Sequence, residues 1–298
     1  MRYLIRHDTE YRYTQPATLE HTSAHLQPRA APRQTCRQHR LEIQPPPLSM
    51  TQRLDFFGNP VSIFTIEGPH DRLLVTGHSL VDVEARPPMI DGMSQPWEPL
   101  RQALRTDVSP EGLDAYQFTF DSPLSAGSRE LRPYVEQSFS PGRPIFDAAR
   151  ELTSRIHADF AFDPKATDVS TPVSQVFAER RGVCQDFAHL MIACLRTLGL
   201  PARYVSGYLR TEPPPGQPRL IGADASHAWV SVYCTGMGWL DLDPTNDCVV
   251  DTDHVTVAWG RDYGDVTPVK GLIVGGGQHT VEARVDIVPE GDATTVAT

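Results

Sequence analysis

A helical pattern that follows directly on a cysteine constrains this chain more than any other feature. Its apolar residues recur at the three- and four-residue spacing of one buried helix face; they are Phe187, Leu190, Met191, Cys194, Leu195 and Leu198. Gly199 and Pro201 then supply a stop signal. We therefore expect a helix that ends near residue 198, with Cys184 at or just before its first turn.

A cysteine in this place has two interpretations. The N-terminus of a helix presents unpaired N–H groups and the positive end of the macrodipole, so that it favours an anion. A thiol there tends to have a lowered pKa, and the thiolate is the nucleophilic form. A buried structural residue is the usual state of a lone cysteine, however. The helix alone supports both interpretations of Cys184 equally.

The composition excludes several broad classes of protein. With 298 residues, of which 40% are hydrophobic and 21% charged, the chain is long enough for one large or two ordinary soluble domains. Its net charge of −10 argues against a general nucleic-acid binder, which would carry a basic face. The same charge gives no reason to expect attraction to anionic membranes. We therefore expect neither nucleic acid nor a membrane as a partner.

The cysteines and the first residues bear on the compartment. Five widely scattered cysteines are not a disulfide framework and suit a reducing compartment, and none stands at zinc-ligand spacing. Charges at Arg2, Arg6 and Asp8 interrupt the apolar core that a signal peptide needs. No run of about 18 apolar residues is present that could span a membrane. The prediction is a cytoplasmic protein without a cofactor or metal.

Three regions are expected along the chain, at 1–90, 91–142 and 143–290. The first contains short strands of alternating polarity between turn signals, which predicts an antiparallel β-rich domain. The second is irregular and Pro-rich at both ends, and is interpreted as a linker region with short helices. The third begins with helices and continues with strands, a segregation that predicts an α+β fold.

Within the third region the elements follow from periodicity and punctuation. Helices are expected at 144–157, from Thr171–Pro172 onward, and after Cys184. Strands are expected at 202–209, 227–233, 239–243, 255–259 and 281–287. A Pro- and Gly-rich loop at 213–216 and a frayed tail from residue 291 complete the expectation.

A tight turn near residue 236 joins two of these strands and brings two polar residues together. In such a hairpin, positions whose numbers sum to about 472 lie opposite one another, so His227 lies within a residue or two of Asp243. Asp241 shares a strand face with Asp243 and is its rival. We prefer Asp243, because its place at the strand end gives the better register with His227.

Cys184, His227 and Asp243 together supply a thiol, a base and a carboxylate that orients the base. Taken singly, a strand histidine is more often a surface residue, and an aspartate before proline is more often a turn former. A metal site of Cys184 and His227 lacks further ligands at suitable spacing. His189 and Cys194 are interpreted as structural residues of the same helix, five and ten positions after Cys184.

Three separate motifs in this order resemble the transglutaminase-like superfamily. They are Arg181-Gly182-Val183-Cys184-Gln185-Asp186-Phe187, Ser226-His227-Ala228-Trp229-Val230, and Gly238-Trp239 with Asp243-Pro244-Thr245-Asn246. The N-terminal part resembles the β-rich domain of bacterial members in Tyr11–Tyr13, Leu26–Arg29 and Asp55–Asn59, and Gly260–Val266 resembles a further bacterial stretch. The resemblance implies a papain-like core with Cys184 as nucleophile, His227 as general base and acid, and Asp243 as the orienting residue.

The resemblance also implies a reaction class. A bacterial cysteine protease or amidase would hydrolyse amide bonds of peptides or proteins through an acyl-enzyme, whereas a transglutaminase would transfer the acyl group to an amine acceptor. The backbone N–H of Cys184 is the expected oxyanion donor, with a second donor sought in the 160–170 turn or at Gln185. Gly182 is expected to clear space for the substrate. The alternative from another class is a non-catalytic module that binds an extended peptide.

Overall fold

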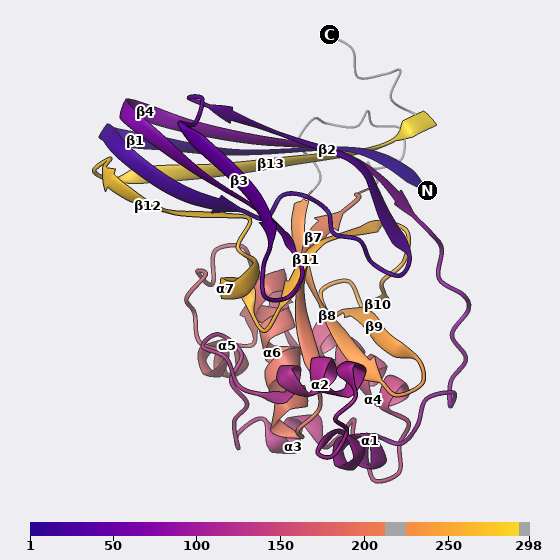
Figure 1. Ribbon diagram of the computed structural model, residues 1–298. Coiled ribbons are helices and arrows are strands. Elements are labelled where there is room, and N and C mark those ends of the chain that lie inside the picture. The colour runs from indigo at the N-terminus through magenta and orange to yellow at the C-terminus, as the bar shows by residue number, and fades with distance from the viewer. Residues whose placement is uncertain (212–224, 292–298) are drawn as a thin grey trace, which may run out of the picture.

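The structure is a computed structural model that describes residues 1–211 and 225–291. The loop predicted at 213–216 and the tail beyond residue 291 lie outside this range. The described residues form a long antiparallel sheet that lies across a second part made of helices and a smaller sheet (Figure 1). This confirms the α+β class, with a β-rich N-terminal portion.

The long sheet combines strands from both ends of the chain. Its N-terminal strands are β1 (Arg2–Ala24), β2 (Gln34–Gln44), β3 (Ser49–Leu54) and β4 (Pro60–Val83). They are joined by β12 (Val269–Gly275) and β13 (His279–Pro289), which both pair with β1 in antiparallel register. The yellow strands of Figure 1 accordingly lie beside the indigo ones.

Residues 84–268 are thus inserted between β4 and β12 of this sheet. The strand expected at 281–287 exists, but it belongs to the long sheet and not to the sheet that contains His227. Alternation alone marks a strand without naming its partner, which explains the difference. The limits 1–90, 91–142 and 143–290 stay a prediction as domain boundaries.

The inserted part contains the helices. They are α1 (Trp97–Leu104), α2 (Pro110–Tyr116), the 3-10 helix Gln117–Thr119, α3 (Arg132–Val135), α4 (Ile145–Asp159), α5 (Val173–Glu179), α6 (Cys184–Thr197) and α7 (Tyr263–Val266). The helices predicted at 144–157, from Thr171–Pro172 onward and after Cys184 exist as α4, α5 and α6, and Pro144 and Pro172 are the N-cap residues of the first two. Across residues 1–211 and 225–291, no helix combines the length and the apolar composition needed to cross a membrane.

A five-stranded antiparallel sheet completes the inserted part, in the order β10-β9-β8-β7-β11. Its strands are β7 (Ala202–Leu209), β8 (Ala225–Cys234), β9 (Gly238–Asp243), β10 (Cys248–Val249) and β11 (His254–Gly260). The two short strands β5 (Ala161–Phe162) and β6 (Arg181–Gly182) pair in parallel just before α6. Strand β7 has the limits that the sequence predicted.

Helix α6 lies at the centre of the inserted part. It packs on β7 and β8, and on α3, α4 and α5. Every residue from Asp186 to Arg196 is therefore buried. The prediction of a single buried face was too narrow, because helices cover the face of α6 that the sheet leaves open. Its N-terminus with Cys184 is held at a fixed place in the core.

Candidate active site

The start of α6 is fixed by an aspartate in its own first turn. Asp186 Oδ2 accepts a hydrogen bond from the Val183 backbone N–H at 2.8 Å and another from Thr167 Oγ1 at 2.6 Å. This carboxylate therefore satisfies one of the N–H groups that a helix start leaves unpaired. Cys184 is the first residue of the helix and is partly exposed, so its thiol is placed precisely and reagents can reach it.

Gly182 makes room for this aspartate. A Cβ at position 182 would lie 2.6 Å from Asp186 Oδ2 and 2.9 Å from Asp186 Cβ. The structure thus gives a different reason for this glycine from the space for a substrate that the sequence suggested. A side chain at position 182 would displace the carboxylate that organises the turn containing Cys184.

We expect Gly182→Ala to lower the free energy of unfolding by about 1–3 kcal/mol, because the added methyl group overpacks a closed contact. Urea unfolding of the two proteins measures the difference. Gly291→Ala is the matched control, since a Cβ at that position meets no neighbouring atom. Equal unfolding midpoints for Gly182→Ala and the parent protein would contradict this interpretation.

The hairpin of β8 and β9 has the register that the sequence predicted. Val230 lies opposite Leu242 and Ser231 opposite Asp241, so opposed positions sum to 472. Asp243, at the end of β9, reaches the first residues of β8, and its Oδ2 lies 2.7 Å from Nε2 of His227. Asp243 is therefore the carboxylate that contacts His227, and Asp241 pairs further along the hairpin.

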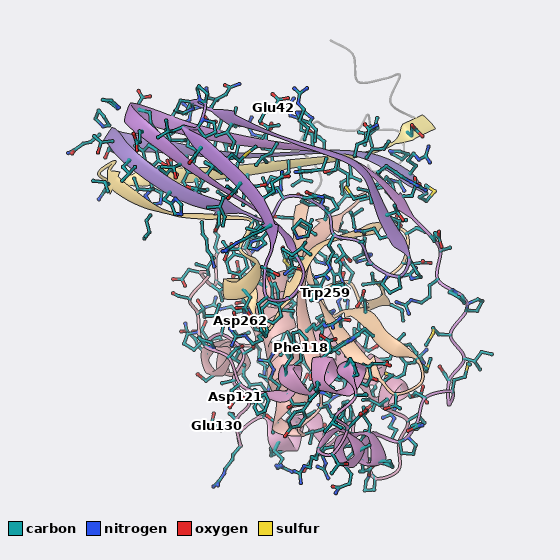
Figure 2. All side chains as sticks on the ribbon, in the orientation of Figure 1. Glu42, Phe118, Asp121, Glu130, Trp259 and Asp262 are labelled. Atoms are coloured by element: carbon teal, nitrogen blue, oxygen red, sulfur yellow. The ribbon has the colours of Figure 1, made fainter. Side chains whose placement is uncertain are left out.

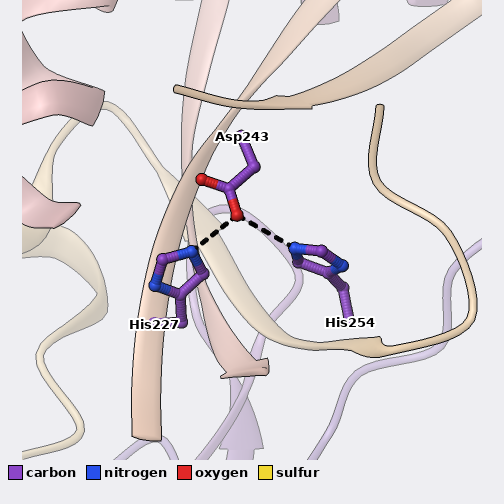
Figure 3. A group of neighbouring side chains, drawn as sticks. All are labelled: His227, Asp243 and His254. Atoms are coloured by element: carbon purple, nitrogen blue, oxygen red, sulfur yellow. Dashed lines mark hydrogen bonds and ion pairs between the residues drawn. The ribbon is translucent and has the colours of Figure 1, made fainter. Parts of the chain in front are cut away.

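Asp243 is the centre of a dense hydrogen-bond cluster (Figure 3). Its fully buried carboxylate accepts from His227 and Asn246 side chains, from His254 Nε2 at 3.1 Å, and from the backbone N–H groups of Thr245 and Asn246. Burial by itself favours the neutral acid, but the hydrogen bonds from His227 and His254 outweigh it and hold the pKa of Asp243 far below its usual range. The carboxylate is therefore ionised and can only accept hydrogen bonds.

His227 stands between this carboxylate and the thiol. Burial alone lowers the pKa of His227, but its hydrogen bonds to Asp243 and to the side chain of Cys184 outweigh burial and raise the pKa well above the ordinary value. Since Nε2 bonds to Asp243, Nδ1 is the ring nitrogen left for Cys184. The structure thus brings the three predicted residues together in the order thiol, imidazole, carboxylate.

Two residues that hydrogen-bond to Asp243 were not predicted from the sequence as site residues. Asn246 donates its side-chain amide to Asp243 Oδ2 at 2.7 Å. His254 shares that same oxygen, is buried, and makes a T-shaped contact with the ring of Trp229 at a centroid distance of 5.2 Å. The one available signal was positional, because His254 opens an apolar strand just as His227 stands near the start of another.

His189 and Cys194 have the buried, structural surroundings that the sequence predicted. His189 is buried, accepts a hydrogen bond from the Tyr263 backbone N–H at 3.1 Å, and has a pKa lowered to about 4 by burial. Cys194 is fully buried in the core. Gln185, considered as an oxyanion donor, gives its amide to the carbonyl of Val169 at 3.2 Å.

His227, Asp243 and His254 also offer ligand atoms within 4.8 Å of one another, close enough to hold a metal ion. The Nε2 atoms of His227 and His254 already donate hydrogen bonds to the carboxylate of Asp243, at 2.7 and 3.1 Å. We therefore interpret the group as a hydrogen-bonded cluster. A thiol hydrogen-bonded to an imidazole that a buried carboxylate orients is an arrangement suited to nucleophilic attack and proton transfer.

Models of known protein families match both the N-terminal part and the inserted part of the chain. The sequence model described as "Bacterial transglutaminase-like N-terminal region" matches residues 3–82, and that of the "Transglutaminase-like superfamily" matches residues 133–244. The second match includes Cys184, His227 and Asp243. A crystal structure from Cytophaga hutchinsonii, provisionally described as a cysteine protease, has the same fold with a TM-score of 0.73 at 22% identity, over 97% of this chain and 90% of that one.

Sequence relatives cover nearly the whole chain or about a third of it. The uncharacterized protein Rv2569c of Mycobacterium tuberculosis is 44% identical over 98% of this chain and 94% of its own length. Protein ML0607 of Mycobacterium leprae is 34% identical over 95% of this chain and 97% of its own length. A protein-glutamine gamma-glutamyltransferase of Pseudomonas aeruginosa is 38% identical over 92 residues, which are 30% of this chain and 14% of that protein.

Proposed function

Because this chain belongs to the transglutaminase-like superfamily, we propose that it is a cysteine enzyme that forms an acyl-enzyme on amide bonds of peptides or proteins. Hydrolysis is the favoured outcome, which makes the protein a peptidase or amidase. The observation that carries the proposal is the buried 2.7 Å contact between His227 Nε2 and Asp243 Oδ2, with Cys184 close enough to the same imidazole to raise its pKa.

The first half of the reaction cleaves the amide. The Cys184 thiolate attacks the carbonyl carbon, a C–S bond forms, and the carbonyl oxygen becomes an oxyanion. The backbone N–H of Cys184, in the first turn of α6, is the proposed donor to that oxyanion. As the tetrahedral intermediate collapses, the C–N bond breaks, and His227 gives its Nδ1 proton to the departing amine.

The second half releases the acyl group from the thioester. Neutral His227 takes a proton from a water molecule, whose oxygen attacks the thioester carbonyl. The C–S bond then breaks and the product leaves as an acid, while Cys184 and the protonated His227 return to their starting state. Asp243 holds Nε2–H throughout, so that the ring keeps Nδ1 toward the thiol.

Transamidation is the second candidate, and it uses the same residues with an amine in place of water. The 38% identity to a protein-glutamine gamma-glutamyltransferase over 92 residues favours it. The two reactions differ in which acceptor reaches the thioester. The substrate is proposed to be a peptide or protein amide, and the cytoplasmic location stays a prediction.

The test incubates the protein with a peptide library, with and without a fluorescent primary amine. We expect amine release in both samples and a carboxylic acid product in the sample without the label. If the product carries the fluorescent amine more often than it forms the free carboxylic acid, transamidation and not hydrolysis is the reaction. Neither product, together with Cys184 that reacts with an electrophile no faster than Cys36 or Cys194, would favour the non-catalytic peptide-binding module.

A further inference from the structure

A second histidine contacts the carboxylate of Asp243. His254 is the first residue of β11, and its Nε2 lies 3.1 Å from Asp243 Oδ2, the same oxygen that accepts the hydrogen bond from His227 (Figure 3). Because the ionised carboxylate only accepts, His254 Nε2 must carry a proton and donate it. Only 7% of His254 is exposed, so water is a poor substitute for this hydrogen bond. His254 thus fixes one side of Asp243 while His227 occupies the other.

The ring of His254 is also held from the side of the sheet. Trp229, which is fully buried, makes a T-shaped ring contact with His254 at a centroid distance of 5.2 Å and reaches it across β7. Gly207 on β7 permits this approach, because a Cβ there would lie 2.3 Å from both Trp229 and the Val255 carbonyl oxygen. The position of His254 therefore depends on where β11 lies.

Strand β11 is the edge of the five-stranded sheet, and the N-terminal part of the chain covers that edge. Gln34 accepts from the Thr256 N–H at 2.8 Å and donates to the Thr256 carbonyl at 2.7 Å. Asn59 accepts from the Trp259 N–H at 2.9 Å and donates to the Trp259 carbonyl at 2.8 Å. Each side-chain carboxamide therefore makes both hydrogen bonds that a neighbouring strand would make with that residue.

Arg29 joins these two contacts. Its backbone N–H donates to the Val257 carbonyl at 3.3 Å, its guanidinium stacks on the ring of Trp259, and it also donates to Asn59. Three successive points of β11 are thus bound to residues from outside the five-stranded sheet. Gln34 itself begins β2 of the long sheet. The edge strand that carries His254 is fixed by the β-rich N-terminal portion.

We propose that His254 is a positioning residue for Asp243, and that the N-terminal portion takes part in catalysis by holding β11, and with it His254, through Gln34 and Asn59. This proposal rests on the proposed Cys184–His227–Asp243 chemistry. It gives the N-terminal portion a part in the reaction that acts through β11 and His254.

The rate of Cys184 alkylation by iodoacetamide, followed by mass spectrometry of each cysteine, tests the proposal without a known substrate. His254→Phe keeps the ring shape but removes the donor, and we expect alkylation about 10- to 100-fold slower, as for loss of a hydrogen bond to a charged group. His254→Gln restores a donor and should recover most of the rate. If His254→Phe does not fold, His254→Asn, whose shorter amide stops short of Asp243, takes its place.

A double-mutant cycle separates positioning from a general structural effect. If His254 acts through Asp243, adding His254→Phe to Asp243→Ala changes the alkylation rate no further. A further slowing in that background would overturn the proposal. Slow wild-type labelling of Cys184, no faster than Cys36, would instead overturn the proposed function. Fast wild-type labelling that His254→Phe leaves unchanged would overturn the positioning role alone.

The part played by the N-terminal portion is tested from the other side of β11. Gln34→Leu removes both hydrogen bonds to Thr256 at similar volume, and we expect slower alkylation of Cys184 that His254→Phe largely masks. The matched control is Gln52→Leu on β3, whose amide donates to Ser62 at 3.4 Å and whose strand pairs with β4 in the long sheet. Equal rates for Gln34→Leu and Gln52→Leu would overturn the part assigned to the N-terminal portion.

Discussion

Replacement of Cys184 by alanine will abolish amide cleavage while the protein keeps its fold. In the proposed mechanism the sulfur of Cys184 forms the acyl-enzyme, and neither His227 nor Asp243 can take its place. We expect turnover to fall by at least about 10⁴-fold, as when the nucleophile of a triad is removed. Because Cys184 is partly exposed, the free energy of unfolding should change by less than about 1 kcal/mol.

The measurement combines product release from the peptide library with thermal unfolding of each variant. Cys36→Ala is the matched control, since Cys36 is also a partly exposed free thiol but lies on β2 of the long sheet. It should keep the wild-type rate. Full activity in Cys184→Ala would remove the nucleophile assignment, whereas an unfolded Cys184→Ala protein would show that the residue has a packing role that its exposure does not indicate.

Replacement of Asp243 by asparagine should lower the rate by about 10³- to 10⁴-fold, because the side chain would then present an N–H donor to Nε2 of His227. The imidazole would lose both its orientation and the negative charge that stabilises its protonated form. Its pKa would fall, since Asp243 is a main cause of the raised pKa of His227. The reaction needs protonated His227 as the acid, so the basic limb of the pH–rate profile should move to lower pH.

Asp241→Asn is the control for this variant. Asp241 lies on the same strand, opposite Ser231, and does not contact His227 among the hydrogen bonds and ion pairs of residues 1–211 and 225–291. Its rate and pH profile should stay close to those of the parent protein. If Asp241→Asn carried the large loss and Asp243→Asn did not, the residue that orients His227 would have to be reassigned.

Local patterns made the centre of the site predictable. The spacing of Phe187, Leu190 and Met191 placed Cys184 at a helix start, and helix α6 begins there. The turn at Gly236, whose φ is +80°, fixed the register of β8 and β9 and so selected Asp243 over Asp241. Each of these inferences depends on residues within about one hairpin or one helix of each other, where sequence spacing and spatial distance agree.

The surroundings of the site could not be predicted in this way. His254 meets Asp243 although their strands are separated by β8 and β7 in the sheet, and periodicity says nothing of such a contact. Gln34 contacts Thr256 across more than two hundred residues of sequence. A carboxamide that replaces a neighbouring strand has the same composition as any exposed glutamine, so only the fold identifies it.

The pairing of β1 with β12 and β13 bears on whether the N-terminal region could act as a detachable pro-segment. Many hydrolases are made as zymogens, in which one cut releases an inhibitory N-terminal segment. Here a cut in the connection after β4 would leave the N-terminal strands hydrogen-bonded to β12 and β13, with register pairs from Tyr3–Pro289 to Ala24–Val269. The N-terminal region is therefore built as a permanent part of the fold rather than as a detachable pro-segment.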